Sequence, residues 1–490
     1  MRQPREATSL RCVAGLLAPL AVAAVVAAEQ GVGDQASSAA ASSSATPPQS
    51  STSTPSQADG SSTQTSASPQ PPTGPGAAST TPSSRLPEEG VPGSALPFEG
   101  VWPWESNRLT GEWFGVRPKL RDLGIDFEAS LYIDWVANMR GGIETGSRFP
   151  YLWNLQLSLD LGKLASIPGG EVFVLGQIAE GNNPSANLVG DYQGVDNIAI
   201  FNGVSQVSQL WYRQTLLDGR LAAQVGKLDI LFSFAAPSAG ANFINNGLNY
   251  PATMNISLPT YPEPAFGVLV EGKPTDWLGL KAAIYDGSDP PAINALQSGT
   301  GGAGPATFFD NTAGYFVVGE ANITWTLPGA RAGTLALGGW GVTGEYPDFL
   351  GGIQKGMQGG YGYVEQAIWL ADEKDPTGPG VTLWLMGSAA EQTANPASWA
   401  LSGGSTWTGP IPGRPQDQAG LGAAYVNFSS TDPTRFPEGY ELTLEAYYQL
   451  NLTSWLTIQP DLQYVINPGG GGLGATEDAL VGILRMVVTF

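Results

Sequence analysis

The chain has 490 residues, with 65 Gly, 39 Pro, 14 Trp, 16 Tyr and 17 Phe, and only 13% of its residues are charged. It contains no His and one Cys, Cys12, and its formal net charge is −21. These values exclude histidine-based catalytic triads and histidine-ligated zinc, argue against an ordinary helical cytosolic protein, and disfavour a nucleic-acid partner, whose phosphates would be repelled.

Residues 1–28 have the features of a secretory signal peptide. Arg2, Arg5 and Arg11 precede an apolar stretch that ends in small residues near Ala28, as signal peptidase requires. Cleavage there would remove Cys12 and leave a chain without disulfides or thiol chemistry. A retained signal anchor is the alternative.

Residues 29–97 are dominated by Ser, Thr, Pro, Ala and Gly. Such a segment cannot bury enough apolar surface to offset the entropy of ordering, so we predict a disordered linker, with an interaction such as wall tethering as the alternative. Composition changes near Phe98. We expect 98–124 to be a periplasmic segment with a short helix that ends at Gly124.

From Ile125 the hydrophobic period becomes two. Apolar residues from Ile125 to Trp135 alternate with polar ones, and 151–160 repeats the pattern. Strands of outer-membrane barrels alternate in this way over about ten residues, because one face meets lipid and the other a wet lumen. The last segment also alternates and ends on the aromatic Phe490, as such barrels do, which places Arg485 toward the pore and Phe490 toward lipid.

We predict about sixteen strands within 125–490, an even number as bacterial barrels require. After the first two, they lie near 170–180, 208–217, 219–230, 264–273, 277–286, 314–325, 333–344, 360–370, 379–391, 397–407, 418–429, 439–451, 454–466 and 478–490. Tight turns alternate with long Gly- and Asn-rich connections such as 181–207 and 345–359, as expected for periplasmic turns and outer loops. The alternation breaks once, where 393–396 is short and 408–417 is long, which we interpret as misplaced strand ends.

The connection 231–263 is too long to be only a turn, and it contains aromatic and Asn residues such as Phe234, Phe243 and Tyr250. Its apolar content favours a loop packed inside the barrel that narrows the pore. An outward loop that covers a neighbouring subunit is the alternative.

Strand parity places a set of polar and aromatic side chains in the lumen, where amides, carboxylates and guanidinium groups could bond sugar hydroxyls and aromatic rings could stack on sugar rings. The candidate pore-lining and sugar-contact residues are Asp134, Gln156, Asp160, Trp211, Arg213, Lys281, Glu320, Glu445, Tyr447, Gln459, Asp461 and Arg485. The alternative is a solvated charge network with aromatic girdles. The excess of carboxylates predicts passage of neutral or cationic solutes rather than anions.

A glycosidase is a further alternative, because Glu441 and Glu445 share one strand face and Asp461 lies on the neighbouring strand. Alternating acids on a lumen face arise without catalysis, so we predict that the protein is not an enzyme and has no metal or cofactor.

Several motifs resemble the carbohydrate-selective porin (OprB) family. They include the run from Leu109 to Ile125, Leu210-Trp-Tyr-Arg-Gln214, Val225-Gly-Lys-Leu-Asp229, Tyr285-Asp-Gly287, Gly338-Gly-Trp340, Gly409-Pro-Ile-Pro-Gly-Arg-Pro415, Leu456-Thr-Ile-Gln-Pro-Asp-Leu-Gln-Tyr464 and Ile466-Asn-Pro-Gly469, in the order of the family. The sequence departs from the family at Trp113-Phe-Gly-Val-Arg117 and in its long linker. The resemblance implies an outer-membrane barrel through which sugars diffuse passively.

Together these features predict an all-β protein, a transmembrane antiparallel β-barrel of about sixteen strands (125–490) preceded by a disordered tether, in the outer membrane of a Gram-negative bacterium. Its expected partners are small neutral carbohydrates and outer-membrane lipid, with no nucleic acid, and a trimer or a monomer fits the sequence equally. The alternatives are a general or cation-preferring porin and a structural, wall-tethered barrel without sugar selectivity.

Overall fold

The computed structural model describes residues 108–490, except 181–182, 202, 256–257, 288–304, 312–313, 432, 473 and 476. The predicted signal peptide, the predicted linker and the first residues of the predicted periplasmic segment lie outside the described residues. Within the described ranges, no helix combines the length and the apolar content that a bilayer-spanning helix requires.

Strands make up most of the described chain. They are β1 (Ile125–Arg140), β2 (Gly146–Arg148), β3 (Tyr151–Asp160), β4 (Gly170–Glu180), β5 (Val204–Leu216), β6 (Leu221–Leu228), β7 (Ala265–Thr275), β8 (Leu278–Asp286), β9 (Tyr315–Leu327), β10 (Arg331–Pro347), β11 (Ile353–Leu370), β12 (Gly380–Ala390), β13 (Ala397–Thr408), β14 (Gln418–Phe428), β15 (Tyr440–Asn451), β16 (Leu456–Ile466) and β17 (Ala479–Thr489). The helices are α2 (Val116–Leu123), α3 (Leu161–Ala165), α4 (Asn246–Asn249) and α6 (Pro305–Asp310), with short helical turns η2 (Trp113–Gly115), η3 (Ser185–Val189), η4 (Leu217–Gly219), η5 (Ile230–Phe232), η6 (Ser238–Gly240), η7 (Ala252–Met254) and η8 (Pro468–Gly471).

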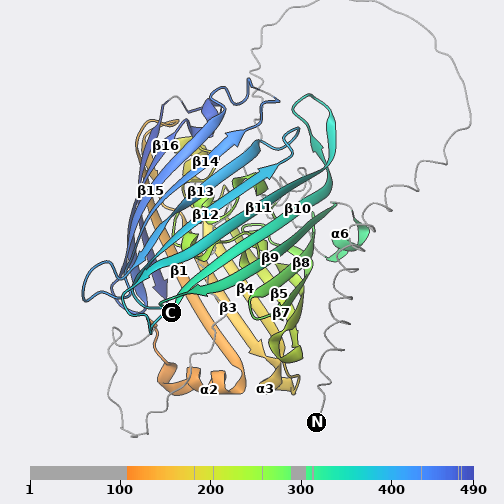
Figure 1. Cartoon of the computed structure of the whole chain (residues 1–490), viewed down its shortest axis with the longest axis vertical. Coiled ribbons are helices and arrows are strands. Elements are labelled where there is room, and N and C mark those ends of the chain that lie inside the picture. The colour runs from red at the N-terminus through yellow and green to blue at the C-terminus, as the bar shows by residue number, and fades with distance from the viewer. Residues whose placement is uncertain are drawn as a thin grey trace, which may run out of the picture. The chain divides into compact units, whose positions relative to one another are not determined.

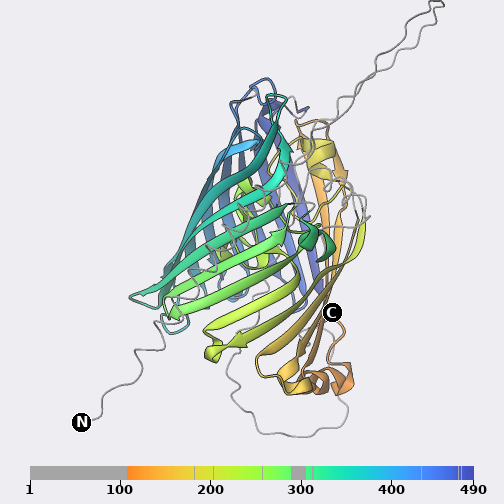
Figure 2. The ribbon, with the colours of Figure 1, turned by 90° about the vertical axis from the view of Figure 1, so that its right-hand side faces the viewer.

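The strands form one closed antiparallel barrel (Figures 1 and 2). Each long strand pairs with the next long strand in the sequence, and β1 closes the sheet by pairing with both β3 and β17. The short β2 pairs only with the end of β1, so it extends a hairpin and the wall has sixteen strands. Closure gives every wall strand two partners and removes the free sheet edges. The predicted antiparallel barrel of about sixteen strands is confirmed.

The seam between β1 and β17 shows the predicted alternation of side chains. Arg485 lies directly opposite Asp134 and faces a cavity inside the barrel. Phe490 lies on the outer surface, where its ring centroid is 5.0 Å from that of Trp153. The parity inferred for the last strand is therefore correct.

Two predictions about connections are wrong. The β10–β11 hairpin continues to Pro347 and resumes at Ile353, so most of the predicted loop 345–359 is strand. The break in the alternation of short and long connections is real, since β12 ends at Ala390 and β13 begins at Ala397.

The long turn after β13 is held by a compact polar network. The Arg414 guanidinium pairs with the Asp417 carboxylate, which also accepts hydrogen bonds from the Tyr448 hydroxyl at 2.7 Å and the Asn451 N–H at 3.0 Å. Local charge-assisted bonds of this kind stabilise a long turn without a second hairpin. The Arg414 hydrogen bond is the main reason that the pKa of Asp417 lies below its usual range.

Helix α2 ends as the sequence predicts. Gly124 follows it with φ 94° and its N–H bonds the Arg121 carbonyl, a left-handed helix end for which glycine is suited. Figure 1 shows α2 and α3 at the barrel end where β1 begins. This end carries the tight turns, and we call it periplasmic.

Candidate functional site

Two long connections at the other end of the barrel fold into the lumen. We call residues 183–203, between β4 and β5, the first inner loop, and 229–264, between β6 and β7, the second inner loop. Most of their described side chains are buried. The predicted inward packing of 231–263 is therefore confirmed, and the alternative of an outward loop is wrong. The first inner loop was expected only to be long.

Apolar side chains of the second inner loop fill the lumen on one side. Phe234, Tyr250 and Met254 form a buried cluster with inward residues of strands β7 to β11, among them Phe316 and Trp340. Close packing of this kind leaves the remaining space on the opposite side of the loop. The open part of the lumen is therefore off-centre.

Carboxylates on the barrel wall hold the second inner loop by its backbone. Glu445 accepts hydrogen bonds from the N–H groups of Ile244 at 2.6 Å and Asn245 at 3.0 Å. Glu320 accepts from the Ala235 N–H at 2.9 Å, and Glu365 from the Ala239 N–H at 2.5 Å. Irregular backbone inside a barrel lacks partners of its own, and charged acceptors supply them with strong bonds.

Glu441 does the same for the first inner loop and for the connection between β16 and β17. It accepts hydrogen bonds from the N–H groups of Tyr192 at 2.7 Å, Gln193 at 3.0 Å and Gly469 at 2.6 Å. The carboxylate oxygens of Glu441 and Glu445 accept hydrogen bonds from loop backbone N–H groups. They are therefore not arranged as the pair of carboxylates flanking a substrate that glycoside hydrolysis requires.

Arg485 joins the first inner loop to the barrel seam. Its guanidinium donates to both Asp134 carboxylate oxygens, at 2.6 to 3.1 Å, and to the Asn197 side-chain oxygen at 2.6 Å. A carboxylate oxygen of Asp196 lies 3.6 Å away. The Arg485 side chain thus links β17 to β1 and to the first inner loop, and the carboxylates of Asp134 and Asp196 compensate its positive charge.

The other two candidate cations are also paired. Arg213 forms an ion pair with Glu271 at 2.5 Å, and Lys281 forms one with Glu320 at 3.2 Å. Lys281 also donates to the Ser233 carbonyl of the second inner loop at 2.5 Å. Each of the three cations predicted to line the pore therefore has a carboxylate beside it.

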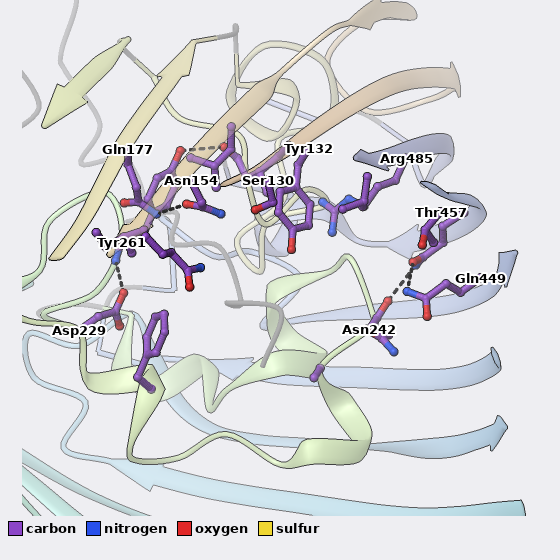
Figure 3. A pocket seen from close by; sticks show the side chains of 18 residues that line it. Ser130, Tyr132, Asn154, Gln177, Asp229, Asn242, Tyr261, Gln449, Thr457 and Arg485 are labelled. Carbon is purple, nitrogen blue, oxygen red and sulfur yellow. Dashed lines mark hydrogen bonds between the residues drawn. The ribbon is translucent and has the colours of Figure 1, made fainter. Parts of the chain in front are cut away.

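A cavity of about 140 Å³ lies between the second inner loop and the wall formed by β15, β16, β17, β1, β3 and β4. Ten of the eighteen residues that line it carry an amide or a hydroxyl group, namely Asn154, Gln156, Gln177, Asn242, Gln449, Gln459, Ser130, Tyr132, Tyr261 and Thr457. The charged residues of the lining are Asp229 and Arg485. Figure 3 shows Tyr132 and Arg485 between the amides of β3 and β4 and those near β16.

The amides of the lining are partly engaged with one another. Gln177 donates to Asn154 at 2.9 Å, and Gln459 donates to the Asn242 carbonyl at 2.8 Å. The buried side-chain oxygen of Gln177 has no hydrogen-bond partner among the described residues. The lining therefore offers an acceptor that a solute or water would satisfy.

The twelve candidate residues divide into three groups. Gln156, Gln459 and Arg485 line the cavity. Asp134, Arg213, Lys281, Glu320 and Glu445 belong to the ion pairs and loop contacts described above. The remaining four, Asp160, Trp211, Tyr447 and Asp461, have other contacts.

Trp211 faces inward but stacks on Phe173 with ring centroids 4.9 Å apart. Tyr447 packs edge-on against Phe243 of the second inner loop, and Asp461 accepts from Gln463 at 3.2 Å. Asp160 ends β3 and caps α3 by accepting from the N–H of Gly162 at 2.9 Å. Asp160 therefore has a capping role at the end of β3 instead of the predicted role in the lumen.

Several residues of the site were not among the candidates. Gln177 and Gln449 line the cavity, Asn242 reaches it from the second inner loop, and Glu365 holds that loop. Strand parity places Gln177 and Glu365 inward, so the periodicity contained a signal for both. Asn242 had no such signal, because a loop has no fixed period.

Two carboxyls of the second inner loop have perturbed acidities. Burial raises the pKa of Asp229 to about 6, although its oxygens accept from Thr260, Leu231 and Tyr261. Burial also raises the pKa of Glu263 to about 7. Within the described residues, no group of three or more acidic or Cys side chains is arranged to hold a metal ion.

Comparison with known proteins gives a consistent result. Residues 148–490 match the family described as "Carbohydrate-selective porin, OprB family". "Porin B" of Pseudomonas aeruginosa is 24% identical over 439 residues, which cover 81% of this chain and 94% of that protein. The high-pH structure of Pseudomonas putida OprB has a TM-score of 0.69 and 21% identity, over 79% of this chain and 99% of that one. The low-pH structure of the same protein has a TM-score of 0.51 and 18% identity, with the same coverage.

Proposed function

The chain belongs to the carbohydrate-selective porin, OprB family, and we propose that the amide-lined cavity beside the second inner loop is the part of its lumen through which sugars pass. The protein is a porin of the Gram-negative outer membrane that lets small sugars diffuse into the periplasm. The chemistry of the cavity lining determines how the pore selects among solutes.

The composition of the lining carries the proposal. An amide offers two N–H donors and a carbonyl acceptor without net charge, and a hydroxyl offers both roles. A neutral sugar presents the same mixture of donors and acceptors, so it can exchange water for these groups one bond at a time. Tyr132 and Tyr261 add apolar ring surface beside them.

The charge balance supports selection against anions. Arg485, the one cation of the lining, is held by Asp134, and Arg213 and Lys281 also have carboxylate partners. An anionic solute would therefore meet no uncompensated cation among these three residues, while Asp229 would repel it. Neutral monosaccharides are the substrates that this arrangement favours.

Liposome swelling tests the selectivity. With purified protein in vesicles, neutral monosaccharides should enter faster than sugar acids of similar size. Equal rates would instead support the alternative of a general porin, and faster entry of amino sugars than of neutral sugars would support a cation-preferring porin.

A single substitution tests the assignment of the lining. Gln156 on β3 faces the cavity, so Gln156→Leu should slow monosaccharide entry several-fold. Gln358→Leu is the matched control, because Gln358 lies on the exposed outer face of β11. If vesicles with Gln156→Leu and vesicles with Gln358→Leu both swell at the wild-type rate in monosaccharide solution, the sugar path does not follow β3.

Wall tethering is a second candidate function, because the Ser- and Pro-rich segment 29–97 has the composition of a linker. Deleting 31–96 separates the two functions: a porin keeps its sugar flux, whereas a tethering protein loses its attachment to the wall.

A further inference from the structure

Residues 108–123, which precede β1, pack against the start of β1 and the C-terminal end of β17. Leu109 N–H donates to the Thr489 carbonyl at 2.8 Å, and Arg117 donates to the Phe490 backbone oxygen at 3.1 Å. The ring centroid of Trp113 lies 5.9 Å from that of Phe127, on the outward side of β1. This segment therefore covers the part of β1 that extends beyond its last pair with β17, on the side where the wall faces lipid.

The segment lies at the barrel end where tryptophans gather near the hairpin turns. Five periplasmic hairpins each place a tryptophan at or near the turn, namely Trp277, Trp325, Trp369, Trp407 and Trp455. Three of these rings, Trp277, Trp369 and Trp407, are strongly exposed. Tryptophan prefers the headgroup region of a bilayer, so these rings mark the periplasmic interface. Trp113 supplies a ring at the seam, where no hairpin exists.

Large apolar side chains of the segment point away from the protein. Phe114 is 99% exposed, Leu123 59% and Val116 48%. Trp113 and Phe114 both have left-handed backbone, with φ 50° and 55°, a conformation that bulky residues rarely adopt. The chain thus holds a strained turn that presents Phe114 outward, which is unfavourable in water and favourable in an apolar medium.

The charge of the segment is opposite to that of the chain. Residues 108–123 contain Arg108, Arg117, Lys119 and Arg121 against Glu112 and Asp122, whereas the whole chain has a net charge of −21. Lys119 is exposed. Cations beside exposed apolar residues are the pattern of segments that lie in an anionic membrane interface.

We propose that Trp113–Leu123 is an interfacial anchor that binds the periplasmic leaflet of the outer membrane. Phe114, Val116 and Leu123 enter the boundary between headgroups and acyl chains, and Lys119 contacts the phosphates of anionic phospholipids. The anchor continues the tryptophan belt across the seam.

Spin labelling tests the position of Phe114. In the full chain with Cys12→Ser, a nitroxide is attached at Phe114→Cys, at Leu421→Cys on the outward face of β14 and at Asp218→Cys in the β5–β6 turn. The label at 114 should collide with oxygen more than with a water-soluble nickel complex, as at 421 and unlike 218. A water-like result at 114 overturns the proposal, and dipolar broadening between labels would show that a second copy covers the segment instead.

Lipid composition tests the choice of headgroup. In vesicles that contain phosphatidylglycerol, Lys119→Gln should weaken association with spin-labelled phosphatidylglycerol at this site about fivefold, the effect of one cation near an anionic surface. Lys374→Gln, in the distant β11–β12 turn, is the matched control and should change it little. Equal association of the wild-type protein with phosphatidylcholine and phosphatidylglycerol would overturn the anionic headgroup assignment.

Discussion

Replacement of Arg485 by Gln is the most informative perturbation of the barrel. The Arg485 and Asp134 side chains are 8% and 0% exposed, and they lie directly opposite each other across the seam that closes the barrel. Without the guanidinium, the Asp134 carboxylate would be buried without its cation and would face Asp196 of the first inner loop. Arg485 counteracts the rise in the pKa of Asp196 that burial and the charge of Asp134 produce, so the variant should raise that pKa further.

The expected size of the effect follows from burial. Breaking a buried ion pair by removing one partner costs about 3–5 kcal/mol, because a charge is left without compensation. At about 1.4 kcal/mol per factor of ten, the folding equilibrium should shift by roughly a hundredfold to a few thousandfold. Arg213→Gln is the internal control: the Arg213 and Glu271 side chains are 28% and 25% exposed, and such a pair contributes about 1 kcal/mol or less.

Unfolding in urea, followed by the shift in electrophoretic mobility of the heated and unheated barrel, measures both variants. Single-channel recording of the same samples should show added current noise for Arg485→Gln, since the first inner loop loses its contact through Asn197. Equal and small losses of stability in the two variants would refute the argument that the seam pair is structurally dominant.

Two further predictions concern the second inner loop. Glu445→Ala removes the acceptor of two backbone N–H groups, so it should destabilise the barrel by about 2–4 kcal/mol. It should also raise single-channel conductance and reduce the preference for neutral sugars over anions. Glu345→Ala, which removes an exposed partner of Lys355, should have none of these three effects. The raised pKa of Asp229 means that the folded state holds this proton more tightly than the unfolded state. Its contribution to stability should be complete below about pH 4 and decline by roughly 3 kcal/mol as the pH rises to about 6, and urea titrations in which Asp229→Asn shows the same pH dependence as the wild-type protein would contradict this sign.

Much of the fold was predictable because a strand period is local. The alternation around Leu484, Arg485 and Met486 correctly separated the lipid face from the lumen face without any knowledge of neighbouring strands. Turn position was harder where side chains stabilise an unusual length, as Arg414 and Asp417 do after β13. Hairpin length was missed where glycines such as Gly356 and Gly359 suggested a loop and the register continued instead.

The candidate site was predictable as a set of inward positions but not in its roles. Strand parity correctly placed Glu320 and Glu445 inside the barrel. The prediction that such carboxylates contact the solute assumed that the lumen contains no loops. The lumen instead contains two loops whose backbone competes for those acceptors. Asp160 shows the same limitation at a strand end, where its carboxylate caps a helix.

Local periodicity and short motifs were enough to predict the barrel, its approximate strand number, the two faces of regular strands such as β17, and the family. The sequence did not reveal which polar groups hold loops, which line the cavity or where the segment before β1 packs, because these depend on contacts made in the folded barrel. The physical reason is the distance along the chain between partners: Glu445 meets the N–H groups of Ile244 and Asn245, and Arg485 meets Asp134 and Asn197, only after the barrel has closed.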